Sequence, residues 1–176
     1  MVKIARYLAY MLFFILSFLI FLPKENLYFL LEKELSKKEV FISDEVVTTS
    51  VFSLEVDSAL VSYEGIEVAK IKKTKFDLYL FYNAIELNDI ELSSLVSNYW
   101  PSKVQSAVVS YSVLNPLEVT AVARGSFGEI KAHYLLKESK VKVVLKPSKL
   151  ILSKYRSSLR YFKKSKDGEY SYEKSL

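Results

Sequence analysis

Hydrophobic residues follow three different patterns along this chain, and each pattern predicts a different kind of element. Residues 7–22 form a run of sixteen residues without a charge. Residues 24–38 repeat leucines at helical spacing, and from Val40 onward apolar and polar residues alternate with a period of two. We therefore expect a transmembrane signal anchor at 1–22, an amphipathic helix at 23–38 and a β domain at 39–176.

The N-terminal run has the composition of a membrane-spanning helix. With Ile4 and Ala5, and with Arg6 extending its charged end to the membrane surface, it provides about 19 residues, which at about 1.5 Å per residue span roughly the 30 Å of a hydrocarbon core. It ends Phe-Leu-Pro-Lys, without the small residues of a cleavage site, so we expect the anchor to be retained. Lys3 and Arg6 precede it, which places the N-terminus in the cytoplasm. We therefore expect a single-pass protein of the inner membrane whose C-terminal domain lies in the periplasm.

The segment at 23–38 predicts a helix with one apolar face. Pro23 stands where a helix begins, a position at which its missing N–H costs nothing. Lysines and glutamates occupy one face of this helix, and the other face has four leucines spaced at i, i+3, i+4 and i+8: Leu27, Leu30, Leu31 and Leu35. We expect this helix either to lie at the membrane interface or to cap one end of the β domain.

The remainder predicts an α+β fold that is mostly β, a curved antiparallel sheet built from hairpins. Alternating segments recur about every 9–12 residues in the second half, separated by turn signals such as Asn115-Pro116. A bulge is expected at Asn88-Asp89. Short helices are expected at 92–99 and, near the C-terminus, at 153–164.

Several strands are expected to be apolar on both faces. In the segment 77–82, Leu78 and Leu80 would face one way while Tyr79 and Phe81 face the other. Such a sheet must be covered by helices, by curling, by a partner or by lipid. If the sheet forms an apolar groove, its lining is expected to be Leu78, Leu80, Val109, Tyr111, Val119, Ala121, Tyr134 and Val143.

Composition and charge limit the kinds of site and partner that this chain can have. There is no cysteine, which excludes disulfides and zinc–thiolate sites in this chain. The net charge is +5, and the stretch from Lys146 to the end contains nine basic residues against three acidic ones. We interpret this basic tail as a solvated surface and expect no nucleic-acid partner.

The candidates for catalysis are few. His133 is the only histidine and is expected on the surface of a strand. Five carboxylates are expected on strand exteriors: Glu55, Asp57, Glu86, Asp89 and Glu91. The sequence contains no glycine-rich phosphate loop. We therefore predict no catalytic, cofactor-binding or metal-binding residue, no cofactor and no enzymatic activity.

Four segments together resemble a known family: Leu22-Pro23-Lys24-Glu25-Asn26-Leu27-Tyr28, Val61-Ser62-Tyr63-Glu64-Gly65-Ile66, Gly125-x-x-Gly128-Glu-Ile and Asp167-Gly168-Glu169-Tyr170-Ser171-Tyr172. In these features the chain is similar to the type II secretion system protein N family, which is related to the AsmA-like periplasmic proteins. The resemblance extends over nearly the whole chain.

The resemblance implies an inner-membrane protein with a strongly curved periplasmic sheet that serves as an accessory part of an envelope secretion machine. It would act through contacts with other envelope proteins. AsmA-like relatives imply phospholipid transport along an apolar groove, although this chain is long enough for only one sheet unit. The layout also resembles the single-span, β-jellyroll component of the lipopolysaccharide transport bridge, where acyl chains lie on the concave face. Both alternatives remain open at this point.

Overall fold

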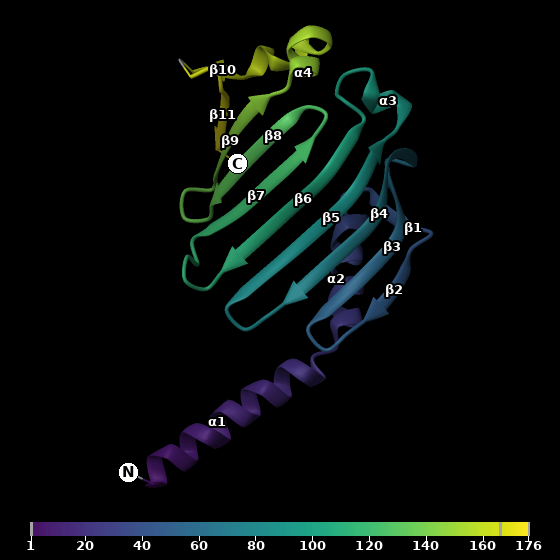
Figure 1. Ribbon diagram of the computed structural model, residues 1–176. Coiled ribbons are helices and arrows are strands. Elements are labelled where there is room, and N and C mark those ends of the chain that lie inside the picture. The colour runs from purple at the N-terminus through teal and green to yellow at the C-terminus, as the bar shows by residue number, and fades with distance from the viewer. Residues whose placement is uncertain (1, 166, 176) are drawn as a thin grey trace.

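The computed structural model describes residues 2–165 and 167–175, and an antiparallel sheet dominates it (Figure 1). The helical elements are α1 (Val2–Phe21), α2 (Lys24–Ser36), α3 (Ser94–Ser97), α4 (Lys149–Lys154) and the 3-10 segment η1 (Arg156–Tyr161). The strands are β1 (Val40–Ser43), β2 (Val46–Thr49), β3 (Ser53–Tyr63), β4 (Ile66–Leu78), β5 (Tyr82–Leu92), β6 (Lys103–Ser112), β7 (Glu118–Gly125), β8 (Gly128–Leu135), β9 (Lys140–Pro147), β10 (Lys163–Lys164) and β11 (Tyr170–Ser175).

The sheet is a continuous meander. Its order is β1-β3-β4-β5-β6-β7-β8-β9-β11-β10, and β2 also pairs with β3. Every pair of consecutive strands from β3 to β9 is antiparallel. Short turns join these strands, except that the connection between β5 and β6 contains α3. The predicted mostly β, antiparallel fold is confirmed.

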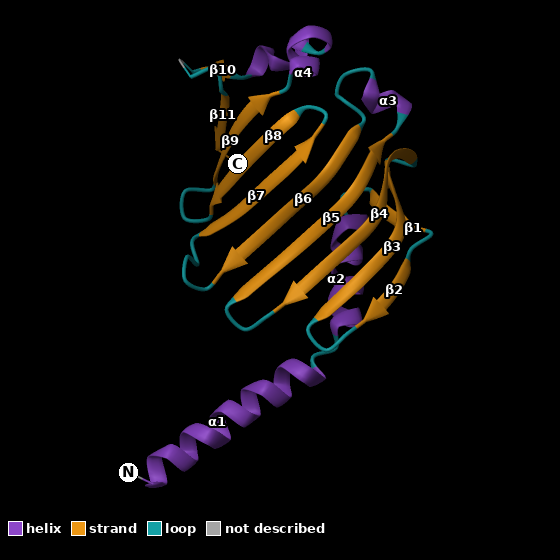
Figure 2. Ribbon diagram, in the orientation of Figure 1, coloured by secondary structure: helices purple, strands orange, loops and turns teal. Residues whose placement is uncertain are grey.

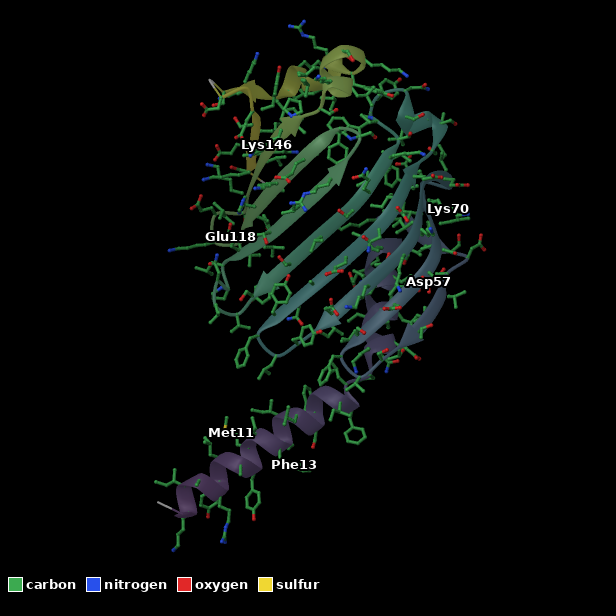
Figure 3. All side chains as sticks on the ribbon, viewed as in Figure 1. Met11, Phe13, Asp57, Lys70, Glu118 and Lys146 are labelled. Carbon is green, nitrogen blue, oxygen red and sulfur yellow. The ribbon has the colours of Figure 1, made fainter. Side chains whose placement is uncertain are left out.

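Helix α1 projects away from the sheet (Figure 1). Figure 3 shows Met11 and Phe13 on different sides of this helix. Within the part of the chain that the structure describes, no helix combines the length and the apolarity needed to cross a membrane, so the predicted span at 1–22 is not supported there.

Helix α2 lies along one face of the sheet, and the strands curve around it (Figure 2). The helix itself was predicted, but its buried side was only partly identified. Leu30 and Leu27 are largely exposed, whereas Tyr28 and Lys24 are buried. The side toward the sheet therefore runs through positions 24, 28, 31 and 35, which have the spacing of one helical face.

The two faces of the sheet differ sharply in polarity. Opposed residues share a face, so the pairing sets Leu54, Phe76 and Ile85 together on the side of α2. The residues between them in sequence, such as Glu55, Lys75 and Glu86, point the other way and are also paired with one another. Figure 3 shows the second face, with Asp57, Lys70, Glu118 and Lys146 labelled on four different strands.

The prediction of a strand at 77–82 with two apolar faces was wrong. Strand β4 ends at Leu78, β5 begins at Tyr82, and Leu78 pairs with Asn83. Residues 79–81 form the hairpin turn. A run of five apolar or aromatic residues gives no period from which a turn can be read, so the alternation argument fails at this point.

A row of unpaired residues crosses the sheet from β3 to β6. It consists of Ser58, Lys72, Asp89 and Gln105, one in each strand. Ser58 and Asp89 have φ values of +60° and +52°. The pairing register of β5 is the same on both sides of Asp89, so the irregularity there is not the extra-residue bulge expected at Asn88-Asp89; the register shift lies at the β6 end of the row, between Val104 and Ser106. The row shifts the alternation by one residue, so that Val56 and Ala59 both face α2.

Two hydrophobic clusters hold the helices to the apolar face. Tyr28 of α2 packs with Leu54, Val56 and Ala59 of β3. At the other end of the sheet, α4 and η1 fold over the same face, where the cluster consists of Phe127, Leu145, Ile151, Tyr155 and Leu159. The single predicted helix at 153–164 is therefore replaced by α4 and η1, and the one at 92–99 shrinks to α3.

Gly128 fixes the corner from which α4 leaves the sheet. Its φ is +112°, and a Cβ at this position would stand 2.1 Å from the Lys146 carbonyl oxygen and 2.8 Å from the Ser148 amide nitrogen. The Ser148 side chain then accepts a hydrogen bond from the Ile151 amide (3.3 Å) and caps α4. Only glycine allows this close approach of backbone segments.

We expect Gly128→Ala to destabilise the fold more than Gly65→Ala. Both glycines have positive φ, so each substitution costs roughly 1–2 kcal/mol of backbone strain. Gly65 faces open space, whereas an alanine at 128 adds an overpacking penalty of about 1–3 kcal/mol. Urea unfolding followed by the fluorescence of Trp100, which packs on Phe127, measures both. Equal losses for the two variants would contradict this account of the corner.

Candidate functional site

The apolar face carries seven of the eight residues expected to line a groove. In one row across the strands, Tyr111 is paired with Val119, and Val119 with Tyr134. Leu78 belongs to the same row, because its partner Asn83 is in turn paired with Tyr111. In the next row, Val109 pairs with Ala121, and Ala121 leads through Ala132 to Val143. The two rows are adjacent on the face that α2 partly covers, and all seven side chains are half-buried.

Leu80 is the exception. It lies in the β4–β5 turn, outside both rows, and 42% of its surface is exposed. Its assignment to the groove depended on the strand expected at 77–82, so it fails with that strand.

A cavity of about 230 Å³ lies between α2 and the sheet. Leu27, Tyr28 and Leu31 contribute from the helix. Five strands contribute the rest of the apolar lining: Leu54, Phe76, Leu78, Ile85, Val109, Tyr111 and Val119. A second cavity of about 200 Å³ lies beside the same helix, over β1, β3, β4 and β5, and is also lined almost entirely by apolar residues. The helix thus covers the face without filling the space beneath it.

Tyr28 holds α2 in place over these cavities. Only 4% of its surface is exposed, and its ring packs edge-on against Phe76 with centroids 5.8 Å apart. Its hydroxyl donates a hydrogen bond to Glu45 Oε1 at 3.4 Å. Burial, followed by the charges of Glu45 and Glu32, raises the pKa of Tyr28 well above its usual value, so the hydroxyl stays protonated and keeps donating.

Lys24 places a positive charge at the first of these cavities. It is 4% exposed and lines the cavity as the first residue of α2. Its ammonium donates to the Leu22 carbonyl at 3.4 Å, and no ion pair of Lys24 is found among the described residues. A buried ammonium with three donors and a single long hydrogen bond is poorly compensated.

The opposite face is polar and crossed by ion pairs. Lys73 binds Glu55 at 2.8 Å, and Lys72 lies 3.5 Å from Asp89. His133 contacts Glu118, and this hydrogen bond holds the pKa of Glu118 below its usual value. Among the residues described, no group of three or more histidine or acidic side chains is arranged to hold a metal ion. The five carboxylates singled out in the sequence all lie on this solvated side or in its ion pairs.

Sequence reasoning missed Tyr28 and Lys24 as parts of the site. Both were assigned to a helix whose apolar side was taken from its leucines alone. A signal was present, because positions 24, 28, 31 and 35 are also spaced along one helical face. Using this spacing to predict the buried side would have placed a lysine toward the sheet, although lysine side chains are usually exposed.

Comparison with protein-family models, with curated proteins and with solved structures found no match for this chain. Its resemblances to secretion, AsmA-like and lipopolysaccharide-transport proteins therefore stay predictions.

We expect Lys24→Met to stabilise the fold. Methionine has a similar length, fills the same apolar surroundings and removes a buried charge that lacks a partner, so the free energy of unfolding should rise by about 1 kcal/mol or more. Urea unfolding of the full chain measures the change, with the exposed Lys33→Met as the matched control on the same helix. A loss of stability at position 24 would mean that the ammonium is compensated in the folded protein.

Proposed function

We propose that this chain is a membrane-anchored lipid-binding module, which holds an acyl chain of a membrane lipid against the apolar face of its curved sheet. One observation supports the proposal above all: the cavity between α2 and the sheet is lined by apolar side chains from β3 to β7 and opens onto a face of the same character. Its 230 Å³ is below the roughly 300–1,000 Å³ of a site for a drug-sized molecule. It suits a segment of one chain rather than a whole lipid.

Helix α1 supports attachment to a bilayer. Leu12, Phe13 and Phe14 follow one another in sequence and therefore point in three directions, yet all three are exposed. A helix that is apolar on all sides requires an apolar environment all round. In the proposal, lipid provides that environment, and α1 holds the domain at the surface of a bilayer.

Lys24 supports a ligand with an acidic head. An anionic phosphate at the mouth of the cavity would supply the ion pair that Lys24 lacks, while the acyl chain occupies the apolar space beyond it. The first amides of α2 lie beside it, and Pro23 gives them no side-chain cap. We therefore propose an anionic phospholipid as the ligand.

A role as accessory component of a secretion machine stays a prediction. It would require a protein partner over the part of the apolar face that α2, α4 and η1 leave open. The lipid proposal and the partner proposal differ in which molecule contacts Val109 and Ala121, so a crosslinking experiment at these two positions distinguishes them.

Photocrosslinking identifies the molecule that contacts the apolar face. A benzophenone amino acid at Val109 or Ala121 is expected to form adducts with phospholipid when the full chain is irradiated in membranes. The matched controls are the neighbours Val108 and Val122, which are paired with each other on the opposite face. They should yield no lipid adduct.

Two outcomes would reject lipid binding. Equal lipid adducts at Val109 and Val108 would show only the proximity of the bilayer. An adduct with another protein at Val109, without lipid, would favour the secretion-machine role.

Lys24→Met is expected to lower the lipid adduct yield at position 109 in anionic phosphatidylglycerol vesicles by about tenfold, because a charge-assisted contact contributes roughly 1.5 kcal/mol. The yield in zwitterionic phosphatidylcholine should change less. Lys33→Met, on the exposed side of the same helix, serves as the control. An unchanged ratio between the two lipids would reject Lys24 as the headgroup ligand.

A further inference from the structure

The hairpin turns at one end of the sheet expose an unusual number of large apolar side chains. These turns join β2 to β3, β4 to β5, β6 to β7 and β8 to β9. Their exposed apolar residues, which we call the turn rim, are Val51, Phe52, Tyr79, Leu80, Phe81, Tyr82, Val113, Leu114, Leu117 and Leu136. Leu114 is 90% exposed and Phe81 is 62% exposed. Turns normally contain small and polar residues, so this composition calls for a physical reason.

Contacts between the turns make the rim continuous. The Leu78 amide donates to the Phe52 carbonyl at 2.9 Å, and the Val113 amide donates to the Phe81 carbonyl at 3.0 Å. Phe52 also stacks on Tyr79, with ring centroids 6.0 Å apart. The apolar side chains of successive turns thus form one surface rather than scattered exposed residues.

Charge is excluded from most of this surface. The turns at 50–52, 79–81 and 113–117 contain no acidic or basic residue, and only the β8–β9 turn does, at Lys137 and Glu138. At the opposite end of the sheet the β3–β4 turn is Glu64-Gly65, while the β5–β6 connection also exposes Leu95 and Tyr99. The rim end is distinguished by the direct contacts that join its apolar turns into one surface.

The apolar helix α1 leaves the domain at this same end. Glu25, in the first turn of α2, accepts a hydrogen bond from Thr49 Oγ1 at 2.8 Å, next to the β2–β3 turn. Lys24 lines the cavity together with Leu78 and Tyr111, which lie where β4 and β6 run into the turns. Figure 1 shows α1 joining the domain beside these turns. The rim is thus continuous with the proposed anchor.

We propose that the turn rim docks into the interfacial region of the bilayer that holds α1, with its apolar side chains reaching the acyl chains. This inference rests on the proposed attachment of α1 to lipid and adds a second contact. Exposed Phe and Leu side chains gain by burial between acyl chains, and Tyr79 and Tyr82 suit the interface because each has an apolar ring and a polar tip. Lipid is favoured over a protein partner because the rim directly continues an apolar helix.

Docking places the mouth of the cavity against the membrane. Leu78, Tyr111 and Val119 line the cavity and directly adjoin the turns of the rim. A lipid could then move its acyl chain from the bilayer to the apolar face without crossing water. The sheet would stand on the membrane by its turns, with α4 and η1 at the far end.

Tryptophan depth measurements test this arrangement in the full chain. Leu114→Trp and Phe81→Trp each place a reporter on the rim, and both residues are exposed, so the fold should tolerate them. Tyr161→Trp in η1 places a matched exposed reporter at the far end. The parent chain, in which Trp100 is the only tryptophan, supplies the background. Each protein is reconstituted into phosphatidylglycerol–phosphatidylcholine vesicles, with and without brominated acyl chains.

The expected result is a shift of rim tryptophan emission to shorter wavelength, with loss of emission in brominated vesicles, while Tyr161→Trp behaves like solvent-exposed tryptophan. Quenching of Leu114→Trp and Phe81→Trp no stronger than that of Tyr161→Trp overturns docking. If the lipid adduct at Val109 persists in that case, the proposed function survives without the rim. A blue shift without quenching also overturns docking, because it means that protein covers the rim. Failure of the chain to float with vesicles overturns both the anchor and the docking.

Discussion

The fold depends on covering a sheet that is apolar on one face only. From β3 to β9 the alternation sends mainly valines, alanines and aromatic residues to one side and mainly polar or charged residues to the other, with Val108 and Val122 as exceptions. Water solvates the charged side at little cost, whereas the apolar side gains only if something removes it from water. The positions of the helices follow from this single requirement.

The chain's own helices meet the requirement only in part. Helix α2 covers the β1–β5 half through Tyr28, and α4 with η1 covers the far end through Ile151 and Leu159. Between them, the rows through Val109 and Val119 stay half-buried, next to a cavity that the side chains of α2 do not fill. A well-packed core leaves few voids of this size, so the open space suits a ligand that comes from outside the chain.

The placement of Lys24 and of the turns bears on the nature of that ligand. A lysine buried beside an apolar cavity lowers stability unless an anion joins it, and such costs are typical of functional positions. The apolar turns likewise gain nothing from water. Lys24 and the apolar turns lie at the end of the sheet where α1 leaves the domain. An anionic bilayer would supply an anion for Lys24 and an apolar environment for both the turns and α1. Lipid binding, membrane attachment and rim docking are thus consistent with one another while resting on different residues.

The sequence by itself determined the strands of the second half and the side that each residue faces. Val109, Val119, Ala121 and Val143 could be grouped correctly because a period of two is a local property of the backbone. It also determined the helix at 23–38. It did not determine the β4–β5 turn, because residues 78–82 offer no polar position to mark a reversal.

Tertiary structure alone decided three features. The pairing of Leu78 with Asn83 set the position of the β4–β5 turn, and Leu80 is exposed because it lies in this turn. The row from Ser58 to Gln105 shifted the alternation in four strands at once, which requires neighbouring strands to adjust together. The packing of α2 against the sheet buried Lys24, against the preference of its side chain for water. Each depends on contacts between residues far apart in the chain, and local periodicity contains no information about such contacts.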